Sequence, residues 1–182
     1  AGYEMLNKFV ANGKVPFNDY SKIVEYEDSC HIIKLNGGDF DTLCDFDDGE
    51  YYETYTIKSD WKSKNQLFMK YVNWEETNDF LFNKDDGSIY FLGPTYQFST
   101  KLNWIITYID FNEQPLFPNY FGVAHLSNRE VIPLIDWENK EININDASWL
   151  NDSTAILKAF IYNETQFDIV DEKYFYVMTI NQ

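Results

Sequence analysis

The chain has 182 residues and a formal net charge of -16, because 30 acidic residues face 14 basic ones. Hydrophobic residues make up 45% of the chain and aromatic residues 19%, which is enough for a real core and argues against disorder. Such an acidic surface repels phosphate backbones and anionic membranes, so binding to nucleic acid is not expected. No apolar run reaches the ~20 residues of a membrane-spanning helix. The length of the chain favours a single domain over residues 1–182.

The N-terminal segment, residues 1–22, is the one predicted helical or capping element. Met5, Leu6, Phe9 and Val10 follow helical spacing, and Gly13 is placed to end the helix. We expect this segment to cap the end of a sheet. Because the chain starts with Ala1 rather than Met, we also expect a processed or trimmed product.

From Ile23 onward, short apolar and alternating runs predict about a dozen strands separated by turns. Tyr51 to Ile57 alternates between two faces, as a half-buried strand does. The clearest hairpin joins Phe80–Phe82 to Ser88–Leu92 through Asp86-Gly87. Pro133 marks Val131 to Trp137 as an edge strand or a bulge. The sequence therefore predicts an all-β fold built from antiparallel sheets.

A repeated phrase divides the chain into about four β-meander units. An aromatic residue leads, a short polar turn follows, and a run of large apolar residues completes the phrase at Trp61, Phe98 and Trp149. Tyr26 opens a fourth, weaker copy. The steps between the leads are about 35 to 50 residues, in the range of a four-stranded repeat unit.

The phrase at Phe98-Ser99-Thr100-Lys101-Leu102-Asn103 resembles the repeat of WD-repeat and TolB-like β-propellers. It lacks the Pro and Gly of their Phe-Ser-Pro-Asp-Gly-Lys turn. The phrase led by Trp149 shares with that repeat only the leading aromatic residue and an Asn-Asp turn. The resemblance implies blades of antiparallel strands that serve as a binding scaffold. Four blades are near the minimum for closure, so a small or incomplete propeller and a β-sandwich both stay open.

Cys30 and Cys44 lie 14 residues apart across a predicted hairpin. A disulfide between them would place the protein in an oxidising compartment, periplasmic or secreted. Two buried free thiols, compatible with the cytoplasm, are an equal alternative from the sequence.

The densest acidic stretch alternates with tyrosines and is the predicted partner-binding surface. Tyr supplies contact area and acid supplies steering, which together are typical of an interface. The predicted residues are Asp39, Asp41, Asp45, Asp47, Asp48, Glu50, Tyr51, Tyr52, Glu53 and Tyr55. Their order does not match an EF-hand loop, so we predict no metal and no cofactor.

No credible set of catalytic residues is found. Cys30 and His31 are neighbours on a predicted strand and point to opposite faces, and His125 is predicted to be structural. Two alternatives stay open. The first is hydrolysis of a glycoside by a pair of carboxylates, and the second is binding of a sugar that stacks on aromatic rings, without catalysis. The acids for the first are Asp110, Glu113, Asp136 and Glu138, and the rings for the second are Trp74, Trp104 and Trp137.

The preferred interpretation is a non-catalytic acidic protein that binds a basic protein partner. Bacterial inhibitors and immunity proteins that neutralise basic toxins share this profile of charge and aromatic content. The alternatives are a secreted or periplasmic carbohydrate-binding scaffold and a carboxylate-dependent glycoside hydrolase.

Overall fold

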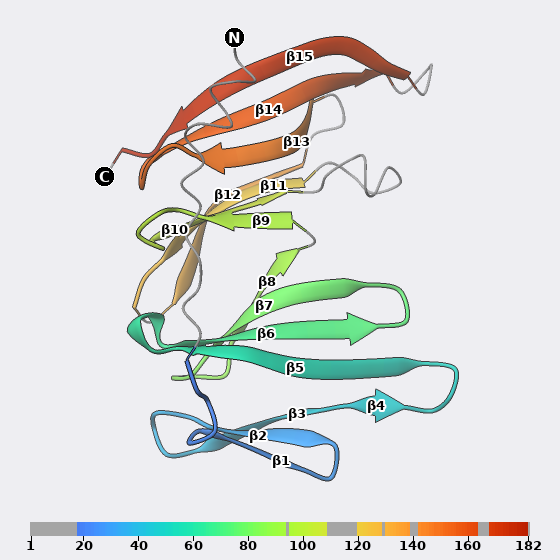
Figure 1. Cartoon of the computed structure of the whole chain (residues 1–182), viewed down its shortest axis with the longest axis vertical. Coiled ribbons are helices and arrows are strands. Elements are labelled where there is room, and N and C mark those ends of the chain that lie inside the picture. Colours follow the sequence, from blue (N-terminus) through green and yellow to red (C-terminus); the bar gives the residue numbers. More distant parts are fainter. Residues whose placement is uncertain are drawn as a thin grey trace. The chain divides into compact units, whose positions relative to one another are not determined.

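The computed structural model describes residues 18–93, 95–108, 120–128, 130–138, 142–163 and 168–181. In these residues the chain forms strands, turns and one short 3₁₀ turn, and the strands make four antiparallel sheets (Figure 1). Within each sheet the strands follow one another in chain order. The all-β prediction and its antiparallel meanders are therefore confirmed. None of the described helical segments is long and apolar enough to cross a membrane.

The predicted N-terminal helix over residues 1–22 is not seen in its described part. Residues 18–23 form a loop and a turn, in which the Asp19 carboxylate accepts hydrogen bonds from the N–H and hydroxyl groups of Ser21, each at 2.9 Å. An aspartate that bonds the backbone two residues on stabilises a turn in place of a helix. Residues 1–17 lie outside the described residues.

The chain divides into two compact units, which are described separately. The first unit comprises residues 15–93 and 127–131, and the second comprises residues 1–14, 94–126 and 132–182. The single domain over residues 1–182 stays a prediction.

The first unit pairs a three-stranded sheet with a five-stranded one. The small sheet contains β1 (Val24–Glu27), β2 (Cys30–Lys34) and β3 (Phe40–Cys44). The larger sheet contains β4 (Phe46–Asp47), β5 (Tyr52–Trp61), β6 (Gln66–Asn73), β7 (Thr77–Asn83) and β8 (Ile89–Gly93). Ile33 of the small sheet packs in one buried cluster with residues of the larger sheet, namely Ile57, Leu67, Met69, Phe80 and Phe82.

Strand register explains which residues enter this core. Leu67 pairs with Phe82 and Met69 pairs with Phe80, so alternate residues of β6 and β7 share one face. Burying each large apolar side chain stabilises the unit by about 1.5–3 kcal/mol. On the same face of β6, Tyr71 follows Met69 beyond the buried cluster, and it pairs with Tyr55 of β5.

The second unit is also built from two sheets around a shared core. One sheet contains β9 (Thr95–Phe98), β10 (Trp104–Tyr108), β11 (Tyr120–Leu126) and β12 (Val131–Glu138), whose first residue, Val131, is counted with the first unit. The other contains β13 (Ile142–Trp149), β14 (Thr154–Asn163) and β15 (Asp168–Thr179). Trp104, Ile106 and Val123 of the first sheet cluster with Trp149 and Leu157 of the second.

The repeated phrase corresponds to a hairpin in each sheet. The leading rings Trp61, Phe98 and Trp149 end one strand and are buried, and the apolar run forms the next strand. Asn65 and Leu102, each four residues after its lead, adopt positive φ angles of 58° and 60°. The fourth lead departs from this pattern, because the ring of Tyr26 is 59% exposed.

Candidate binding groove

The predicted acidic surface does not form one free patch, because several of its carboxylates hold the fold together. Asp41 faces inward from β3, and its carboxylate lies against Gly87 at the tip of the β7–β8 hairpin. Gly87 has a φ of 75°, so the hairpin tip depends on a glycine both for its backbone and for this close approach. Asp39 lies just before β3 and is exposed.

Asp45 joins the two sheets of the first unit. Its Oδ1 accepts the backbone N–H of Tyr55 at 2.7 Å, and its Oδ2 accepts the hydroxyl of Tyr26 at 2.9 Å. The hydrogen bond to Asp45 raises the pKa of Tyr26, since losing the phenolic proton would break it. Asp45 is thus a structural acid.

Asp47 and Asp48 shape the turn between β4 and β5. The Asp48 Oδ1 accepts the N–H groups of Tyr51 at 2.8 Å and Glu50 at 3.1 Å, and these bonds lower the pKa of Asp48. The Asp47 Oδ1 accepts the N–H of Gly49 at 2.9 Å. The Asp48 carboxylate therefore keeps its negative charge, and both side chains fix the turn.

The remaining predicted residues, Glu50, Tyr51, Tyr52 and Glu53, are exposed beside this turn. The ring of Tyr51 meets the ring of Trp74 edge-on, with 5.6 Å between their centroids. Trp74 is 54% exposed and lies in the β6–β7 turn, so two turns distant in sequence form one aromatic contact.

A groove of about 340 Å³ opens on the five-stranded sheet. Its lining residues come from β5, β6, β7, β8 and the β6–β7 turn: Tyr55, Tyr71, Glu76, Asn78, Phe80, Ile89 and Phe91. Of these, only Tyr55 belongs to the predicted surface. The others share its face because of strand register, which pairs Tyr71 with Tyr55 and Phe80 with Phe91.

Aromatic rings form the floor of this groove. The Tyr55 centroid lies 5.3 Å from that of Tyr71 and 6.3 Å from that of Phe80, the second pair at 90°. Phe80 in turn lies 5.8 Å from Phe91, whose side chain is 56% exposed. The exposed end of this row of rings offers a ligand a large contact area, and aromatic side chains lose little conformational entropy on binding.

Carboxylates give the groove a negative potential. Burial, and then the nearby carboxylate of Glu53, raise the pKa values of both Tyr55 and Tyr71. Glu76 adds to the effect at Tyr71. None of the seven lining residues carries a positive charge, and the ion pairs Lys58–Asp79 and Lys84–Asp60 use other acids.

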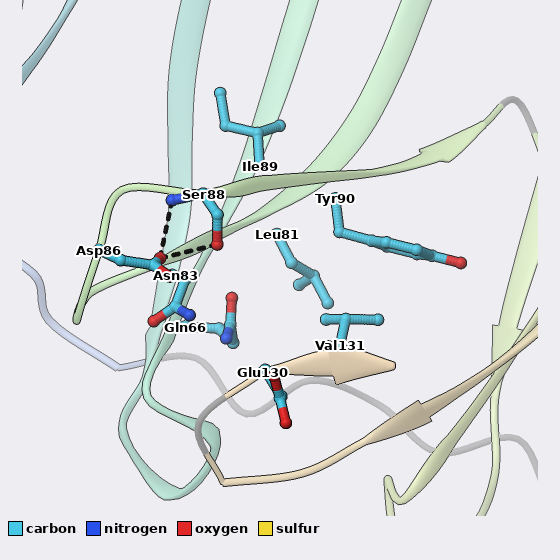
Figure 2. A pocket seen from close by; sticks show the side chains of 9 residues that line it. All are labelled: Gln66, Leu81, Asn83, Asp86, Ser88, Ile89, Tyr90, Glu130 and Val131. Atoms are coloured by element: carbon cyan, nitrogen blue, oxygen red, sulfur yellow. Dashed lines mark hydrogen bonds between the residues drawn. The ribbon is translucent and has the colours of Figure 1, made fainter. Parts of the chain in front are cut away.

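A second hollow, of about 220 Å³, lies in the same unit at the turn end of the β7–β8 hairpin (Figure 2). It is lined by Gln66, Leu81, Asn83, Asp86, Ser88, Ile89, Tyr90, Glu130 and Val131. Its polar residues outnumber those of the aromatic groove, and again no lining residue is cationic.

The residues considered for catalysis are not brought together where they are described. Cys30 and Cys44 form a disulfide across the β2–β3 pair, and the His31 Nε2 contacts the carbonyl oxygen of Tyr55 at 2.8 Å. His125 packs on Trp104, with ring centroids 4.6 Å apart. Asp110 and Glu113, and the side chains of Asp136, Trp137 and Glu138, lie outside the described residues. In the part of the chain that is described, no group of three or more His, Cys, Asp or Glu residues is placed to hold a metal ion.

Comparisons with protein families, with curated proteins and with solved structures found no match to this chain.

Proposed function

We propose that the protein is a non-catalytic acidic binding protein whose aromatic groove receives a basic segment of a protein partner. The observation that carries the proposal is the groove itself, in which the rings of Tyr55, Tyr71 and Phe91 lie beside the carboxylates of Glu53 and Glu76. No cation of the groove lining offsets these charges.

The expected ligand group follows from this chemistry. A lysine or arginine side chain over an aromatic face gains about 0.5–2 kcal/mol, and nearby carboxylates add charge complementarity. The net charge of -16 would also steer a basic partner toward the protein and raise the association rate. Exposed Tyr51 and Trp74 extend the contact surface at one end of the sheet.

The test uses two double variants that change the net charge equally. Glu53→Gln with Glu76→Gln alters the groove, whereas Glu25→Gln with Glu27→Gln alters the exposed edge strand β1. Each variant and the native protein serve as bait in lysate of the native organism, with quantitative mass spectrometry of the retained proteins. We expect basic proteins to be retained by the native protein and the β1 variant, and to fall about tenfold with the groove variant.

The association rate of a retained partner is then measured against ionic strength. We expect it to fall about tenfold or more between low and high salt, as for a steered encounter. A retained set without excess basic proteins, or equal losses with the two double variants, would contradict the proposal. Binding of a glycan, detected as a change in tryptophan fluorescence, would favour the carbohydrate-binding alternative through the exposed ring of Trp74.

We also propose an oxidising compartment, periplasmic or secreted, on the basis of the Cys30–Cys44 disulfide. The protein isolated from its native source is expected to take up a thiol-alkylating reagent only after reduction and unfolding, at two sites. Uptake of two equivalents by the unfolded but unreduced protein would show free thiols and support the cytoplasm.

The propeller resemblance also stays a proposal. The support for it is that four meander sheets follow one another in chain order and that three of them contain a hairpin led by a buried ring. A crystal structure in which successive sheets do not share a common axis would refute it.

A further inference from the structure

The hollow beside the β7–β8 hairpin contains a buried polar group without a partner. Gln66 is 1% exposed, and its Nε2 donates no hydrogen bond. Figure 2 shows its side chain beside Asn83, at the base of the hollow. A buried donor left unsatisfied is unfavourable by about 1–3 kcal/mol, so a ligand oxygen that accepts from Nε2 would recover this free energy. The hollow therefore favours a ligand with a carbonyl or hydroxyl oxygen.

Two carboxylates set the charge that the ligand must carry. Asp86 is fixed by its Oδ1, which accepts the N–H of Ser88 at 2.9 Å and the Ser88 hydroxyl at 2.7 Å (dashed in Figure 2). Glu130 is held through its backbone, whose N–H donates to the Ser127 hydroxyl at 2.9 Å. Since no lining residue is cationic, an anion would be repelled and an ammonium group would be favoured.

The rest of the lining sets the size and the apolar part of the ligand. Leu81 and Val131 provide an aliphatic wall, with the ring of Tyr90 beside them, whereas the Ile89 side chain points to the other face of β8 (Figure 2). A volume of about 220 Å³ corresponds to about seven water molecules at ~30 Å³ each, which is the scale of a single amino acid. All lining residues belong to the first unit.

We propose that this hollow binds a small primary amine that carries a carbonyl oxygen and an aliphatic body, as an amino-acid amide or the first residue of a peptide does. The carbonyl oxygen accepts from the Gln66 Nε2, the ammonium group faces Asp86 with the charge of Glu130 at longer range, and the aliphatic side chain lies on Leu81 and Val131. This site shares only Ile89 with the lining of the aromatic groove, and the proposal does not depend on the function proposed for that groove.

The probe is leucinamide, titrated into the full chain by calorimetry and by NMR. We expect saturable binding in the range of about 0.1–10 mM, and at least tenfold weaker binding of N-acetyl-leucinamide, which lacks the ammonium group. The tripeptide Leu-Gly-Gly distinguishes the two sources of the ligand. Affinity equal to that of leucinamide points to a peptide N-terminus, and weaker binding points to a free amide.

Gln66→Met keeps the size of the side chain and removes the donor, so leucinamide affinity is expected to fall about tenfold. Glu130→Gln, on an exposed loop where folding is not at risk, is expected to weaken binding severalfold. Glu76→Gln in the aromatic groove is the matched control and should leave the affinity unchanged. No saturable binding at about 10 mM leucinamide, equal affinity of the N-acetyl compound, or unchanged affinity in both Gln66→Met and Glu130→Gln would overturn the proposal.

Discussion

Replacing Lys84 by methionine is expected to lower the free energy of unfolding of the first unit by about 3–5 kcal/mol. The Lys84 Nζ lies 2.5 Å from the Asp60 Oδ1, and the two side chains are only 9% and 5% exposed. Removing the lysine leaves a carboxylate buried without its counter-ion, and this desolvated charge is the source of the loss. Protection of the β5–β7 amides in hydrogen exchange would report the change within this unit.

Two further variants separate the effect of the unpaired buried charge on stability from the effect of lost side-chain packing. Asp60→Leu combined with Lys84→Met replaces the pair by apolar side chains and should restore most of the stability. Lys58→Met breaks the more exposed pair with Asp79, at 35% and 14% exposure, and should lower stability by about 1 kcal/mol or less. If Lys84→Met is no more harmful than Lys58→Met, burial is not what makes the Lys84 pair important.

Replacing Asp152 by alanine is expected to lower the stability of the second unit by about 2–4 kcal/mol. Asp152 lies in the turn between β13 and β14, yet its carboxylate binds the turn between β9 and β10. It accepts hydrogen bonds from the Ser99 hydroxyl at 2.8 Å, the Lys101 N–H at 2.9 Å and the Asn103 side-chain amide at 3.0 Å. Its loss removes three hydrogen bonds and separates the turns of two sheets.

The effect of this variant should depend on pH. Burial alone would raise the pKa of Asp152, but the hydrogen bonds from Ser99, Asn103 and Lys101 outweigh it and bring the pKa below its ordinary value of 3.8. The carboxylate therefore stabilises the folded chain fully above pH 3.8, and this contribution is lost as the pH falls through the lower pKa of the folded state.

Urea unfolding of the native protein and of Asp152→Ala at several pH values measures this difference, with hydrogen exchange of β10 and β14 as the local readout. The gap between the two proteins should be constant from neutral pH to about pH 5 and should shrink below the ordinary pKa of a carboxyl group. A gap that grows on acidification would contradict the assigned role. Asp152→Asn, which keeps one acceptor oxygen, should fall between the two proteins.

Local patterns predicted much of the fold. The Asp86-Gly87 turn signal located the β7–β8 hairpin, and the repeated phrases at Trp61 and Phe98 match two turns that share a positive-φ residue at the same position. Both features depend on a few neighbouring residues. The exposed ring of Tyr26 shows where the repeat weakens.

The sequence alone could not predict the buried ion pair between Lys84 and Asp60, because the pair depends on strand register. A β-bulge between Ile57 and Ser59 shifts the pairing, so that Ile57 and Asp60 face the same side although they are three residues apart. Simple alternation would place Asp60 on the opposite face from Ile57. The bulge turns this carboxylate inward to Lys84.

The same limit applies to the candidate site. The groove joins Tyr55, Tyr71 and Phe91 from three strands, and their meeting depends on pairings that no local pattern contains. In the acidic stretch, Asp47 is followed two residues later by Gly49, a spacing that favours a side-chain bond to the backbone and could have identified a turn-forming acid. The buried Gln66 carries no sequence signal that separates it from an exposed one.

An edge strand of the β13–β15 sheet has a consequence for how the protein behaves in concentrated solution. β15 ends the order of its sheet, and Phe175, Tyr176 and Val177 are exposed along it. A long, apolar outer strand is a template onto which another copy can add, and strong mutual repulsion between copies opposes such growth. Storage near pH 4, where carboxylates gain protons, or in concentrated salt would weaken that repulsion and promote fibrillar association.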